Sequence, residues 1–126
     1  MLEIKHPYLL FLGDAVDQLA AKTADGVARW RPEWCLGQLR LPGCAADVGL
    51  PDMSVQEAQE RGARTLVIGV ANRGGIISDV WMETLLSALD AGFDIASGLH
   101  NRLGLLPALA DRAQRLGREL VDVRYP

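Results

Sequence analysis

The feature that most constrains the fold is a nearly continuous apolar run at residues 65–70, Thr-Leu-Val-Ile-Gly-Val. A strand with one solvent-exposed face alternates apolar and polar residues, whereas a strand that is buried on both faces is apolar throughout. Residues 65–70 therefore predict a central strand of a parallel sheet. Four more short apolar runs predict further strands, at residues 8–12, 34–39, 93–97 and 119–123.

Helical patterns lie between these runs. Ser54 and Glu57 have the spacing of a capping box, and Gly62 follows as a stop signal. Residues 16–30 are also helix-like, with a restart expected after Thr23 because Gly26 weakens the pattern. Two later helices are predicted from apolar stripes followed by glycine. These stripes are Met82, Leu85, Leu86 and Leu89 before Gly92, and Leu106, Leu109, Ala113 and Leu116, with Pro107 in the first turn and Gly117 at the end.

The alternation of strand and helix predicts βαβ units with right-handed crossovers and hence a parallel sheet. We expect an α/β fold, a Rossmann-like three-layer αβα sandwich with a mostly parallel five-stranded sheet. The 126 residues are enough for one domain with its own core. We therefore expect residues 1–126 to form a single Rossmann-like domain.

Composition excludes several classes of protein. A net charge of −3 provides no basic field for nucleic acid or for an anionic membrane. The apolar run at residues 8–12 is too short for a signal-peptide core or a membrane span. Cys35 and Cys44 match neither a CxxC pair nor a zinc site, so we expect buried thiols in a reducing compartment. The prediction is a cytoplasmic protein.

The segment after the first predicted strand contains Gly13 and, further on, Lys22 and Thr23. A GxxxxGK[ST] phosphate loop needs glycines where this chain has Val16 and Ala21, so its backbone cradle is missing. The GxGxxG dinucleotide motif is also absent, because Gly13 stands alone. Lys22 and Thr23 can still offer a charge and a hydroxyl to a carboxylate or phosphate. The alternative is a surface lysine beside a helix-capping threonine.

The segment after the third predicted strand contains Arg73, Gly74 and Gly75. Paired glycines let the backbone approach a ligand closely and form an anion-binding nest, and an arginine fork suits carboxylate or phosphate. The helix expected to begin near Ser78 and Asp79 would point its positive end at the same place. The alternative is a tight turn in which the glycines are merely permissive.

The segment after the fourth predicted strand contains Ser97, Gly98 and His100. His100 is a candidate general base, because histidine titrates nearest to neutral pH, and the alternative is a hydrogen-bonded turn residue. Strand ends of a parallel sheet meet at one edge, so these three segments predict a site for a small anionic ligand. Carboxylates at this edge are expected to be few, namely Asp14 and Asp25, which argues against a magnesium or zinc centre.

The order and spacing of several motifs resemble a known family over almost the whole chain, from about residue 8 to residue 126. The family was long described as a domain of unknown function and includes D-glutamate N-acetyltransferases. The motifs that carry the resemblance are Gly13, Lys22-Thr23-Ala24-x-Gly26, Gly74-Gly75, Ser97-Gly98-Leu99-His100 and Asp122-Val123-Arg124-x-Pro126.

The resemblance implies a two-domain protein in which a Rossmann-like N-terminal domain precedes a P-loop domain, which would lie beyond Pro126. It implies acetyl-CoA as cosubstrate and an acidic D-amino acid as substrate, with little activity expected of this domain alone. Carried over by position, the implied site residues are Lys22, Thr23, Gly74, Gly75, Ser97, Gly98 and His100.

Two other hypotheses remain open at this stage. In the first, the chain is a non-catalytic binding or oligomerisation module whose apolar surface around Trp30, Trp34 and Trp81 packs against a partner domain or another copy. A homo-oligomer is expected in either case. In the second, the fold suggests a nicotinamide dehydrogenase, but the missing GxGxxG motif argues against a nicotinamide cofactor.

Overall fold

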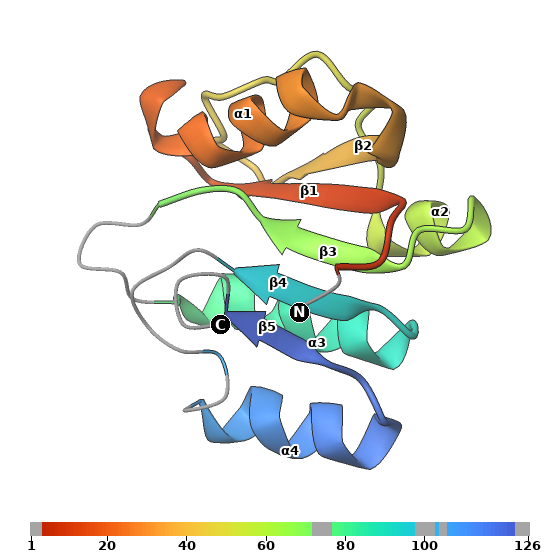
Figure 1. Cartoon of the computed structure of the whole chain (residues 1–126). Coiled ribbons are helices and arrows are strands. Elements are labelled where there is room, and N and C mark those ends of the chain that lie inside the picture. The colour runs from red at the N-terminus through yellow and green to blue at the C-terminus, as the bar shows by residue number, and fades with distance from the viewer. Residues whose placement is uncertain (1–3, 72–76, 98–102, 104–105, 123–126) are drawn as a thin grey trace.

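The structure, a computed structural model, describes residues 4–71, 77–97, 103 and 106–122 (Figure 1). Its centre is one five-stranded sheet in the order β2-β1-β3-β4-β5. All paired strands are parallel, as predicted. The strands are β1 (Tyr8–Gly13), β2 (Cys35–Arg40), β3 (Thr65–Ile68), β4 (Asp94–Ser97) and β5 (Leu120–Asp122).

Helices cover the sheet from both sides. The chain moves one way along the sheet from β1 to β2 and the opposite way from β2 through β5. Right-handed crossovers therefore place α1 on one face and the other three helices on the second face. Figure 1 shows α1 on one side of the sheet and α3 and α4 on the other. The helices are α1 (Lys22–Trp30), α2 (Val55–Glu60), α3 (Asp79–Asp90) and α4 (Pro107–Leu116), with 3₁₀ turns η1 (Leu19–Ala21) and η2 (Pro32–Trp34).

The helix signals read from the sequence are largely confirmed. The Ser54 hydroxyl accepts a hydrogen bond from the Glu57 amide at 3.1 Å, and the Glu57 carboxylate accepts one from the Ser54 amide at 3.1 Å. Pro107 occupies the first turn of α4, and Gly117 ends it in the left-handed region with φ +68°. No helix in the described part of the chain has the length and apolar character to cross a bilayer.

The buried face of α3 begins one residue earlier than predicted. Trp81, only 1% exposed, lies in the core and contacts Phe11 edge to face, with ring centroids 5.3 Å apart. Its indole N–H donates to the Asp14 carboxylate at 2.8 Å. Gly13, with φ +55°, passes so close that a Cβ there would lie 2.9 Å from the indole. The hypothesis that Trp81 belongs to an apolar surface is therefore wrong.

The start of α1 also differs from the prediction. The helix begins at Lys22, after η1, so Thr23 lies inside its first turn and does not precede a restart. Ala21 is the N-cap and makes no side-chain capping bond, which removes the capping role considered for Thr23. Gly26 is accommodated in mid-helix, with open space where a Cβ would stand. A single weak helix former is tolerated because the tertiary packing of α1 outweighs its low helix propensity.

Close packing between α1 and β3 explains why β3 ends before residue 70. The Gly69 amide still donates to the Phe11 carbonyl of β1 at 3.0 Å, but the Gly69 carbonyl accepts from the Ala24 amide at 3.0 Å and so points toward α1. A Cβ on Gly69 would lie 2.4 Å from the Ala24 Cβ, which is far inside van der Waals contact. Only glycine permits this approach of helix and strand.

We expect Gly69→Ala to lower the free energy of unfolding by about 1–3 kcal/mol, because the added methyl group overpacks a rigid contact. Gly26→Ala is the matched control. It adds the same methyl group to α1 where no atom lies within 4 Å, and should stabilise by about 0.5–1 kcal/mol. Urea denaturation of both variants measures the difference, and equal effects would contradict the packing account.

Candidate functional site at the carboxyl edge of the sheet

The carboxyl ends of the parallel strands meet at one edge, where open α/β sheets bind ligands. Lys22 and Thr23 are exposed at this edge, in the first turn of α1, and Ser97 is buried at the end of β4. The remaining predicted site residues lie outside the described residues. They are Arg73, Gly74, Gly75, Gly98 and His100.

The structure brings Thr23 and Ser97, two of the predicted residues, to a common cavity. This cavity has a volume of about 240 Å³ and lies between α1 and the sheet. Val27 and Trp30 line it from α1, and Val67 lines it from β3. The cavity is therefore mainly apolar, with hydroxyl-bearing residues among its lining.

Two backbone amides at the start of α1 are bonded within the protein. The Lys22 amide donates to the Leu19 carbonyl, and the Ala24 amide donates to Gly69. A phosphate loop or dinucleotide fold would leave such amides free for the ligand's phosphates. An anion held here would depend on side chains, namely the ammonium of Lys22 and the hydroxyl of Thr23. Lys22 makes no ion pair with any residue that the structure describes.

The two carboxylates predicted at this edge both have partners. Asp14 accepts from Trp81, as described above, and Asp25 pairs with Arg29 at 2.9 Å. A third carboxylate, Asp122 at the end of β5, accepts from the Leu103 amide at 2.8 Å. Within the described ranges, no three histidine, cysteine, aspartate or glutamate side chains are grouped so as to hold a metal ion.

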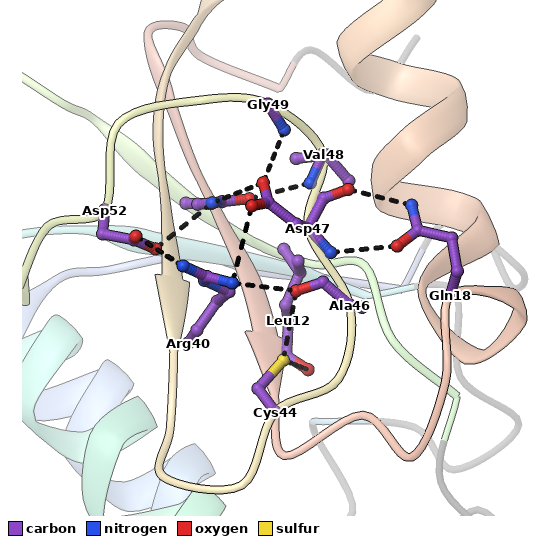
Figure 2. A network of polar contacts seen from close by, with 10 residues as sticks. Leu12, Gln18, Arg40, Cys44, Ala46, Asp47, Val48, Gly49 and Asp52 are labelled. Atoms are coloured by element: carbon purple, nitrogen blue, oxygen red, sulfur yellow. Dashed lines mark hydrogen bonds and ion pairs between the residues drawn. The ribbon is translucent and has the colours of Figure 1, made fainter.

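A polar network that the sequence did not reveal lies at the end of β2 (Figure 2). The Arg40 guanidinium binds both carboxylate oxygens of Asp52, at 2.7 and 2.6 Å, and lies 3.6 Å from the Asp47 carboxylate. The expectation that carboxylates would be few at this edge is thus wrong, because the loop after β2 adds two. Arg40 lies between these two acids, so it is a poor site for an external anion.

Two glutamines extend this network to the loop after β1. Buried Gln38 donates to Asp47 at 3.0 Å and to Asp52 at 3.2 Å, and its carbonyl oxygen accepts from the Val48 amide at 2.9 Å. Gln18 exchanges two hydrogen bonds with the backbone of Asp47, at 2.9 and 3.0 Å. The network therefore fastens the loop after β2 to the segment that leads into α1.

The same contacts change the acidity of both carboxyls. The hydrogen bond from Arg40 lowers the pKa of Asp52, and the Gly49 amide, 2.8 Å away, lowers the pKa of Asp47 together with Gln38. A carboxyl whose pKa is lower in the folded state stabilises the fold above its unfolded-state pKa. That stabilisation is lost as the pH falls through the folded-state pKa.

We expect Asp52→Asn to lower the melting temperature at pH 7. The difference in melting temperature between wild type and variant should become smaller as the pH falls below about 4. The physical reason is that protonated wild-type Asp52 can no longer pair with Arg40. Thermal denaturation between pH 3 and pH 7 tests this. Glu60→Gln, an exposed change that touches no ion pair of the described residues, is the control. A gap that is independent of pH would show that the charge of Asp52 does not matter.

The two thiols are free and partly buried. Burial raises the pKa of Cys35, and the nearby Glu33 carboxylate adds to this effect. A reactive cysteine needs the opposite shift, because the thiolate is the nucleophile. Cys35 therefore shows no sign of activation, and both thiols are only partly buried, although the sequence predicted buried thiols.

The all-parallel sheet and the helices on its two faces define a Rossmann-like α/β domain. Residues 39–126 match the family described as "Domain of unknown function (DUF1611_N) Rossmann-like domain", and the chain belongs to this family. A solved structure of a DUF1611 family protein from Anabaena variabilis is 27% identical and superposes with a TM-score of 0.76. That superposition covers 98% of this chain and 38% of the other.

Two relatives carry the name D-glutamate N-acetyltransferase. The protein from Tritonibacter scottomollicae is 58% identical over 98% of this chain, and that from Pseudoalteromonas sp is 42% identical over 99%. The chain spans only 37% and 38% of the lengths of these relatives. A structure of homoserine dehydrogenase from S. aureus shares the fold alone, with 13% identity and a TM-score of 0.56. The superposition covers 97% of this chain and 33% of the dehydrogenase.

Proposed function

We propose that this chain is the N-terminal, ligand-binding domain of a D-glutamate N-acetyltransferase that uses acetyl-CoA. We also propose that the isolated domain does not catalyse the reaction. The observation that carries the proposal is the 58% identity, over nearly the whole chain, to a relative of that name. The chain covers 37% of that relative, so a C-terminal P-loop domain is proposed to complete the site.

The geometry of the carboxyl edge supports a small anionic ligand. Lys22 is an exposed cation with no acidic partner among the described residues, whereas Arg40 is held by Asp52 and Asp47. Lys22 is thus the described cation at this edge that can bind a carboxylate of D-glutamate, with the Thr23 hydroxyl beside it. Ser97, Arg73 and the glycines at positions 74, 75 and 98 are proposed to supply the remaining contacts.

The proposed reaction is an acyl transfer between a thioester and an amine. The ammonium group of D-glutamate must first lose a proton, for which His100 is proposed as the general base. The amine nitrogen then forms a bond to the acetyl carbonyl carbon and the carbon–sulfur bond breaks. CoA leaves as a thiolate and takes up the second proton, which the nitrogen loses as the amide forms, so the products are N-acetyl-D-glutamate and CoA.

We expect Lys22→Ala to weaken D-glutamate binding about tenfold or more, because a charge-assisted hydrogen bond contributes about 1.5–3 kcal/mol. Calorimetric titration of the isolated chain with D-glutamate measures the dissociation constant. Lys5→Ala is the matched control, since Lys5 is an exposed lysine just before the opposite end of β1. Equal losses in the two variants, or no binding by the wild type at millimolar D-glutamate, would contradict the role of Lys22.

Turnover is tested on the full-length protein with acetyl-CoA and D-glutamate, following release of the CoA thiol. We expect His100→Ala to lower kcat by about 10²–10⁴-fold, the usual contribution of a general base. His6→Ala is the control, because the chain has 2 histidines and His6 stacks on Trp34, away from the carboxyl edge. Absence of acetyl transfer by the wild type would refute the proposed activity itself.

A non-catalytic binding or oligomerisation module is the second candidate. Trp30, which is 66% exposed, is the observation in its favour. That candidate predicts self-association by light scattering and no response to D-glutamate.

A further inference from the structure

The cavity between α1 and the sheet is a local gap in an otherwise closed surface. Val67, which lines it, is half-buried, whereas its neighbours in the same row of the sheet are covered. These neighbours, Leu10, Ala96 and Val121, are 0%, 0% and 6% exposed. A volume of about 240 Å³ is far more than one water molecule needs, and close-packed domains keep few such voids. We propose that this cavity binds the acyl chain of the thioester cosubstrate and admits chains longer than acetyl.

The cavity extends along α1 from the carboxyl edge of the sheet toward the opposite edge. Thr23, in the first turn of α1, and Ser97, the last residue of β4, line it at the carboxyl edge. Trp30, the last residue of α1, and Tyr8, the first of β1, line it at the other end. The helical rise makes the distance from Thr23 to Trp30 about 10 Å. A volume of about 240 Å³ over that length suits one extended chain and is too small for a whole cofactor.

The lining of the cavity selects an uncharged, apolar group. Among the described residues that line it, none carries a charge. The carboxylates of D-glutamate and the phosphates of CoA would lose their hydration there without gaining a partner. The hydrocarbon part of the proposed substrates is the acyl chain of the thioester, so the inference rests on the proposed function. The apolar walls are Ile4, Val27, Val67, Ile68 and Ala96.

This placement brings the reacting carbon to the candidate site. Thr23 lines the cavity, and its neighbour Lys22 is the residue proposed to bind a carboxylate of D-glutamate. With the acyl chain inside, the thioester carbonyl lies at the carboxyl edge, beside Thr23 and Ser97. The amine nitrogen of D-glutamate bonds to that carbonyl carbon as the carbon–sulfur bond breaks, and the protons follow the same course as in acetyl transfer. The methyl of an acetyl group occupies only a small part of the cavity, which leaves room for a longer chain.

A comparison of acyl donors tests the inference in the full-length protein with D-glutamate as acceptor. We expect kcat/KM to be about tenfold higher for butyryl-CoA than for acetyl-CoA, because each buried methylene strengthens binding about fourfold. A lower kcat/KM for butyryl-CoA, with acetyl transfer intact, would overturn the inference and leave the proposed function standing. Absence of transfer from every donor would overturn both.

A substitution that narrows the cavity tests the location of the chain. Val27→Phe adds bulk from α1, so we expect kcat/KM for butyryl-CoA to fall about tenfold or more and that for acetyl-CoA to change less than about twofold. Val80→Phe is the matched control, at a position 56% exposed on α3, across the sheet, and should change neither value. Unchanged use of butyryl-CoA by Val27→Phe would show that the chain does not bind here.

A second variant keeps the test decisive if circular dichroism shows that Val27→Phe does not fold. Trp30 is 66% exposed at the far end of the cavity, and Trp30→Ala lengthens the space. The ratio of kcat/KM for octanoyl-CoA to that for butyryl-CoA should then rise about tenfold. An unchanged ratio would overturn the inference. So would a variant that alters the choice between D-glutamate and D-leucine but not between donors, because the cavity would then hold the side chain of the acceptor.

Discussion

The contact between Gly69 and Ala24 determines how the carboxyl edge of the sheet is built. A helix that follows the first strand of a doubly wound sheet usually presents free amides to a phosphate. Here the Ala24 amide is bonded to Gly69, and the two backbones are too close for any side chain on residue 69. The edge consequently relies on side chains, with Lys22 and Thr23 at its surface. The chain thus keeps the Rossmann-like topology while losing the dinucleotide-binding loop.

The polar network at β2 plays a complementary part. Arg40 stands at the strand end where related folds place a ribose- or phosphate-recognising residue, but Asp52 holds it in a bidentate pair. Two acids around one guanidinium leave a net negative charge there, which disfavours a phosphate. Gln18 then ties the same loop to the entrance of α1.

Local signals predicted most of the fold, because they act over a few residues. The apolar run at 65–70 and the Ser54–Glu57 capping box need no knowledge of the rest of the chain. Thr23 and Ser97, which the topology rule assigned to one edge, line a common cavity. The pairing of Arg40 with Asp52 was missed because the two residues are 12 positions apart in the sequence. Their contact depends on the path of the loop between them, which no spacing motif encodes. Trp81 was misplaced because its partner Asp14 lies 67 residues away.

The uneven covering of the sheet connects these observations. Three crossovers in one direction place three helices on one face, so a chain with the order β2-β1-β3-β4-β5 leaves α1 to cover the other face. Trp30, the last residue of α1, is 66% exposed, whereas Val27 one turn earlier packs against the core.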